Sequence, residues 1–158
     1  MPPIESKNFF SSESLTRLAA VQGKTIEKIV CHLWQNNFNK NEVMELIDNV
    51  ELIFTNQQKL TISSNSEGDA LDVIDFNYTE TTAALEKEFE GKIKLFAVNA
   101  SETKMWIDIK GKILQNIKIT KQDEFYAADS ILLDFGDEKR TISINPVDGL
   151  MIDYYEEV

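Results

Sequence analysis

The single histidine of this chain, His32, directly follows its single cysteine, Cys31. A cysteine and a histidine can act as nucleophile and general base when their side chains lie within hydrogen-bond reach. If this segment is a strand, adjacent side chains point to opposite faces and the two cannot contact each other. We therefore expect Cys31 to pack in the core and His32 to lie at the surface. Zinc sites that need two cysteines and two histidines, or four cysteines, are excluded by count.

Carboxylates are the other abundant groups that could do chemistry. The three aspartates between residues 69 and 75 lack the alternating oxygen ligands and the central glycine of a calcium loop. Asp134, Asp137 and Glu138 surround an expected turn, where acidic side chains commonly serve solubility. The sequence contains neither G-x-G-x-x-G nor G-x-x-x-x-G-K-[ST], so it carries no nucleotide-binding motif. A carboxylate pair of the glycosidase type remains an alternative, because a sequence alone does not reveal a cleft.

Alternating apolar residues predict antiparallel strands that position these groups. Apolar residues recur at every second position in 50–54 and in 131–135, which places them on one face of a strand. Short polar turns follow at 55–58 and 136–138, as in β-hairpins. The predicted core comprises Leu52, Phe54, Ile62, Ile117, Leu133, Phe135, Ile142 and Ile152.

Two segments have helical spacing and helix-ending glycines. Residues 11–23 begin with serines suited to cap a helix and end at Gly23, and residues 79–91 begin with Thr79 as a possible cap and end at Gly91. Residues 37–46 could form a short helix or a long hairpin loop. We expect a further hairpin in which 93–98 pairs with 105–109.

Matching segments in the two halves of the chain predict an internal duplication. Gly23-Lys24 parallels Gly111-Lys112, Asp48–Phe54 parallels Asp129–Phe135, and the pattern T-I-S-x-N occurs once in each half. We therefore predict a single α+β domain over 1–158. It would consist of two related antiparallel β-meander halves, about 11–78 and 79–158, each preceded by a short helix. One continuous sheet, two facing sheets and a partly closed barrel all satisfy this pattern.

Acidic residues outnumber basic ones by 27 to 16, so the formal net charge is −11. Nucleic acids and anionic membranes attract positive charge, so neither is the expected partner. The charge is also uneven. Residues 92–121 hold seven lysines against two acids, whereas residues 122–158 hold ten acids against two bases.

The acid-rich final segment also contains adjacent tyrosines, a combination suited to binding a basic protein. Aromatic side chains anchor protein interfaces, and charges steer and select the partner. The candidate partner-binding residues are Asp134, Asp137, Glu138, Asp148, Asp153, Tyr154, Tyr155, Glu156 and Glu157. The alternative is that Ile152 and Tyr154 belong to the core of the last strand and that the acids are merely solvated.

In general character the chain resembles the immunity proteins with which bacteria neutralise toxins: it is small, acidic and β-rich, and it lacks a catalytic set. That resemblance implies a non-enzymatic inhibitor that occludes the active site of a basic toxin domain, without a cofactor or metal. The alternatives are a small carboxylate-dependent hydrolase or ligand-binding protein, for which Trp34 and Trp106 are candidates, and a structural or assembly subunit.

The start of the chain lacks a basic segment followed by an apolar run, and no stretch of 18 apolar residues occurs. A single cysteine cannot form an intramolecular disulfide. A cytoplasmic location is therefore expected, whereas a monomer and a homodimer remain equally open.

Overall fold

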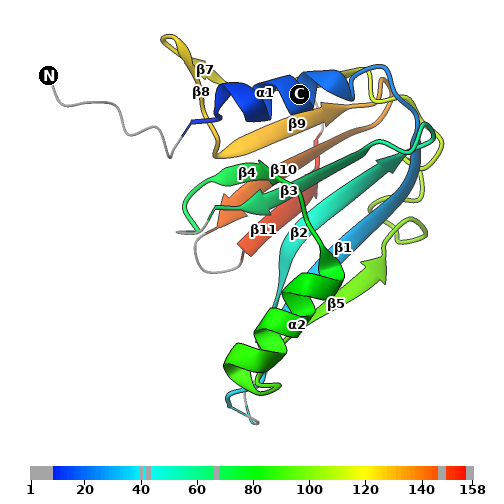
Figure 1. Cartoon of the computed structure of the whole chain (residues 1–158). Helices are drawn as coiled ribbons and strands as arrows, with labels where there is room; N and C mark the ends of the chain where they lie inside the picture. The colour runs from blue at the N-terminus through cyan, green and yellow to red at the C-terminus, as the bar shows by residue number, and fades with distance from the viewer. Residues whose placement is uncertain (1–8, 40, 42–43, 66–67, 146–148, 156–158) are drawn as a thin grey trace, which may run out of the picture.

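A computed structural model describes residues 9–39, 41, 44–65, 68–145 and 149–155 of the chain (Figure 1). The fold is α+β, as predicted, with two helices and a large, mostly antiparallel sheet. The elements in chain order are α1 (Ser12–Ala20), β1 (Ile26–Asn36), β2 (Met44–Phe54), β3 (Lys59–Ser64), β4 (Leu71–Ile74), α2 (Tyr78–Phe89), β5 (Ile93–Asn99), β6 (Asn116–Lys118), β7 (Lys121–Gln122), β8 (Phe125–Tyr126), β9 (Ser130–Asp134), β10 (Lys139–Asn145) and β11 (Gly149–Tyr154).

Nine of the strands form one sheet, and β7 pairs separately with β8. The hydrogen-bonded order is β4-β3-β2-β11-β10-β9-β6, and β1 joins β2 to β5. The chain just before β6 lies beside the start of β1, where Thr25 and Ile113 form an antiparallel bridge. The path from β1 through β2, β11, β10, β9 and β6 therefore closes into a ring, although β2 meets β11 through only one registered pair, Ile47 with Gly149.

The core lies inside this ring. Seven of the eight predicted core residues are buried, and Ile152 is partly buried against them. Trp106 is among the largest fully buried side chains. Burial of such residues is the main driving force for folding.

Part of the sheet projects beyond the ring. The strands β1 and β2 pair along almost their whole lengths, and β5 pairs with the second half of β1. The helix α2 packs on β5 (Figure 1). No residue of α2 is buried, so this helix is held by partly exposed contacts. None of the helices in the described part of the chain is long and apolar enough to cross a membrane.

Both predicted helices form, but one cap differs from the expectation. Ser11 caps α1, because its hydroxyl accepts the N–H of Ser14. The cap of α2 is Asn77 and not Thr79, since the side chain of Asn77 accepts the N–H of Glu80. Asparagine is the better cap because its carbonyl reaches the free amides of the first turn.

The predicted hairpin between 93–98 and 105–109 is wrong. β5 forms but pairs with β1, and residues 101–111 form consecutive turns. These turns are stabilised by bonds of helical spacing, such as those from Trp106 N–H to Thr103 O and from Lys110 N–H to Trp106 O. Met105, Ile107 and Ile109 alternate as in a strand. The buried residues are instead Trp106 and Ile109, whose spacing of three places them on one side of helical turns.

The two glycine-lysine segments contact each other through a matching pair of hydrogen bonds. Gly23 N–H donates to Leu114 O at 2.7 Å, and Gly111 N–H donates to Ile26 O at 2.9 Å. The meanders β2-β3-β4 and β9-β10-β11 also share their order of pairing. However, four strands follow α1 and seven follow α2 in the described part of the chain, so the duplication itself stays a prediction.

Candidate functional site

Three of the predicted partner-binding residues, Asp134, Asp153 and Tyr155, lie on the outer face of β6, β9, β10 and β11. Register places Lys118, Leu132, Thr141 and Asp153 in one row across these four strands. Side chains alternate between the faces of a strand, so this row points away from the core that Ile131, Leu133 and Ile142 fill from the other side. Leu132 is half-buried at its centre.

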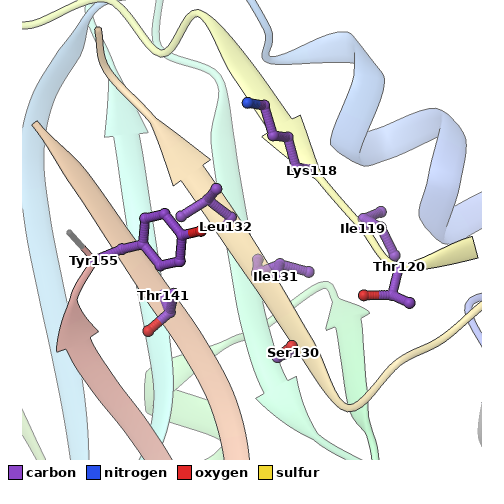
Figure 2. A pocket seen from close by; sticks show the side chains of 8 residues that line it. All are labelled: Lys118, Ile119, Thr120, Ser130, Ile131, Leu132, Thr141 and Tyr155. Carbon is purple, nitrogen blue, oxygen red and sulfur yellow. The ribbon is translucent and has the colours of Figure 1, made fainter. Parts of the chain in front are cut away.

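A hollow of about 270 Å³ lies on this face (Figure 2). Its lining residues supply one ammonium group, four hydroxyl groups and apolar surface, and they are Lys118, Ile119, Thr120, Ser130, Ile131, Leu132, Thr141 and Tyr155. Tyr155 and Thr141 stand beside Leu132, and Lys118 and Thr120 rise from the far side of the hollow (Figure 2). No carboxylate is among these residues, so the hollow suits binding by hydroxyls and apolar contact better than hydrolysis by a carboxylate pair.

The acids at the β9–β10 turn are paired with cations, two of which come from an earlier segment of the chain. Lys112 binds Asp137 at 2.9 Å, Arg140 binds Glu138 at 2.9 Å, and Lys118 lies 3.7 Å from Asp134. Lys112 and Lys118 come from the lysine-rich segment of the sequence. Folding therefore neutralises locally the acidic cluster that the sequence suggested.

The ion pair between Lys112 and Asp137 changes the pKa of the Asp137 carboxyl group. The hydrogen bond from the Lys112 ammonium lowers the pKa of Asp137 below its ordinary value. We expect Lys112→Gln to return this pKa toward that value, as measured by NMR titration of the carboxyl carbon. The native pair favours folding above the ordinary carboxyl pKa, and this contribution is lost as the pH falls through the lowered pKa.

Lys110→Gln is the matched control for this measurement, because Lys110 pairs with Glu102 instead. If Lys110→Gln moved the pKa of Asp137 as much as Lys112→Gln does, the lowered pKa would be caused by long-range charge and not by the direct hydrogen bond.

The two adjacent tyrosines lie on opposite faces of the sheet. Tyr155 is 43% exposed and lines the outer hollow. The ring of Tyr154 covers the guanidinium group of Arg140 with 4.4 Å between their centres, and its hydroxyl donates to Lys104 O. Only Tyr155 is therefore available to the outer face. Asp134 and Asp153 share that face, whereas Asp148, Glu156 and Glu157 lie outside the described residues.

Sequence reasoning missed Leu132, Lys118 and Thr141, the central residues of this face. A usable signal was present, because assigning Ile131 and Leu133 to the core implies that Leu132 faces outward. The position of Lys118 beside Leu132 could not be predicted from alternation, since it depends on the pairing of β6 with β9.

Cys31 and His32 do not form a catalytic pair. Cys31 is buried in the core, as predicted. The prediction that His32 lies at the surface is wrong, because its side chain is 3% exposed. Its Nδ1 lies 2.7 Å from Oδ1 of Asn49, and the rings of Phe76 and Tyr78 lie against it. The loop that precedes α2 buries His32 on the face opposite to Cys31.

Burial disfavours the thiolate form of Cys31. It raises the pKa of the thiol from 9.0 to about 11, which lowers the thiolate population at neutral pH by roughly 100-fold. We expect the native protein to react with iodoacetamide at least about 100-fold more slowly than the urea-unfolded chain. Mass spectrometry of timed samples measures both rates, and similar rates would show that Cys31 is accessible.

In the parts of the chain that the structure describes, no group of three or more histidine, cysteine or acidic side chains could hold a metal ion. The chain matches no protein-family model. Searches of curated proteins and of solved structures likewise found no significant match. A functional proposal must therefore rest on the surfaces of this chain itself.

Proposed function

We propose that this protein is a non-enzymatic binding module that captures a basic protein partner through the outer face of β6, β9, β10 and β11. The observation that carries this proposal is the well-exposed Tyr155 beside the half-buried Leu132 in the hollow on this face (Figure 2), with the exposed Met151 on the same face of β11. Hydroxyl groups and paired charges surround these apolar side chains. An apolar centre with a polar rim is the usual composition of a protein interface.

The net charge of −11 favours a cationic partner. Long-range attraction raises the rate of encounter, whereas the paired charges on the face contribute mainly to orientation. The more specific form of the proposal is a cytoplasmic immunity-type inhibitor that covers the active site of a toxin domain. Its support is the acidic character of the chain together with an open face whose described hollow combines apolar and hydroxyl side chains.

Affinity capture with matched variants tests this function. The tagged protein, Leu132→Lys and the control Ile107→Lys are incubated with extract of the source cells, and retained proteins are quantified by mass spectrometry. Ile107 is exposed on the turn segment, away from the row of Leu132. Equal thermal unfolding of the three proteins is checked first, so that lost binding is not lost folding.

We expect the wild type and Ile107→Lys to retain one lysine- or arginine-rich protein, and Leu132→Lys to retain at least about tenfold less of it. Higher salt should slow association, because screening weakens the attraction. Equal retention by Leu132→Lys would show that this face is not the docking surface. Release of the partner's enzymatic activity by Leu132→Lys would support the inhibitor form.

A further inference from the structure

The strand β5 has a free edge. Among the described strands it pairs only with β1, in an unbroken antiparallel register. The bonds from Asn37 N–H to Lys92 O and from Ala100 N–H to Ile29 O show that the even-numbered residues face β1. The backbone groups of Ile93, Leu95 and Ala97 therefore point to the open side.

One side chain already forms a hydrogen bond at this edge. The hydroxyl of Tyr78 donates to the carbonyl of Leu95 at 3.1 Å, the only hydrogen bond to the open side of β5 among the described residues. Within that same part of the chain, the amide groups of Ile93, Leu95 and Ala97 have no acceptor there. An edge of this kind is a template on which another strand can add.

A groove runs along this edge between α2 and β5, with a volume of about 240 Å³. The helix wall is formed by Tyr78, Thr82, Leu85 and Glu86, and the strand wall by residues 93–96. Since α2 has no buried residue, its inner side is not closed against the sheet. A strand that entered the groove would cover both the open edge and the partly exposed Leu85.

The two faces of such an added strand would meet different chemistry. Ile93 and Leu95 are buried on the α2 face, where Glu86 lines the groove without an ion pair among the described residues. Phe96 and Val98 are 40% and 39% exposed on the opposite face, which also carries Lys94. A complementary strand therefore places cationic side chains toward α2 and apolar side chains beside Phe96 and Val98.

We propose that an extended segment of a partner protein, in which cationic residues alternate with apolar ones, adds to β5 as a new edge strand in this groove. Main-chain hydrogen bonds supply the affinity, and the acidic helix and the exposed Phe96 supply the selectivity. This groove shares no residue with the hollow on the outer face of β6, β9, β10 and β11, so strand addition is tested independently of the proposed function.

The probe is a blocked peptide of about nine residues that alternates lysine with valine, which is long enough to pair with β5. Two control peptides have the same sequence and charge, but one is N-methylated at every lysine and the other at every valine. Each methylation pattern removes the amide donors from one edge of the peptide. NMR titration of the labelled full-length protein measures binding at the amides of Ile93, Leu95 and Ala97.

We expect the parent peptide to shift these amides and to slow their hydrogen exchange. One methylated isomer should bind like the parent, and the other roughly tenfold or more weakly because its docking edge is blocked. Equal binding of both isomers would reveal mere electrostatic adsorption and overturn the proposal. Absence of binding by the parent at millimolar concentration would also overturn it.

Three variants separate the main-chain contribution from charge. Ala97→Pro removes an edge amide that β1 does not use, so it should weaken binding about tenfold while preserving the fold. Glu86→Gln should weaken binding more than Glu13→Gln, which makes the same charge change on α1. Unchanged binding by Ala97→Pro would contradict strand addition. A β5-dependent dimer, detected by light scattering, would assign the edge to a second copy and overturn the peptide proposal.

Discussion

Replacing Trp106 with alanine should lower the free energy of unfolding by about 3–5 kcal/mol. Its side chain is 1% exposed and packs in the core. It belongs to the turn segment 101–111, whose backbone bonds run from Trp106 N–H to Thr103 O and from Ile109 N–H to Trp106 O. The truncation leaves a cavity that this bonded segment cannot collapse to fill. Urea denaturation followed by circular dichroism measures the change.

The neighbouring Ile107 provides the control for this loss. It is exposed, so Ile107→Ala should change stability by no more than about 0.5 kcal/mol. If Trp106→Ala also changed stability by less than about 1 kcal/mol, the turn segment would not be anchored by Trp106.

Arg140→Ala should cost about 3–4 kcal/mol, because it leaves a cavity where the buried stem packs and removes the hydrogen bonds that the guanidinium group donates. The guanidinium group donates to Met105 O at 2.8 Å and to Glu138 at 2.9 Å, and Tyr154 covers it. These contacts join β10 to the turn segment and to β11. Calorimetry at neutral pH should therefore show a lower unfolding temperature.

Arg140→Met distinguishes packing from charge. Methionine retains much of the apolar stem. Nη2 of Arg140 is buried with no hydrogen-bond partner among the described residues, so removal of the guanidinium also relieves a desolvation cost. We expect a loss of only about 1–2 kcal/mol. A loss as large as that of Arg140→Ala would show that the charge-assisted bonds, and not the stem, hold the segment. Glu138 is partly exposed, so Glu138→Gln should have a smaller effect than Arg140→Ala.

The strands and the core could be predicted because their signal is local. The alternation of Val50, Leu52 and Phe54 places one set of side chains inward whatever the strand pairs with. The serine that caps α1 has the same local character, since Ser11 bonds an amide three residues away. The same alternation could have identified Leu132 as a surface residue.

The failures arose where distant contacts overrode a local pattern. The segment around Trp106 alternates like a strand, but its large side chains gain more by burial in the core as turns. His32 was expected at the surface because a half-buried strand normally exposes alternate residues. Phe76 and Tyr78, more than 40 positions further along the chain, cover it instead.

The sequence by itself determined the net charge, the period-two strands and the exclusion of zinc sites that need several cysteines or histidines. These properties depend on composition or on residues a few positions apart. Only the tertiary structure decided that the strands close into a ring, that the ring of Tyr154 covers Arg140, and that Lys112 neutralises Asp137. Such pairings join residues far apart in the chain and depend on the free energy of the whole fold, so no local pattern encodes them. The same reason explains why the open edge of β5 becomes visible only when its pairing with β1 is known.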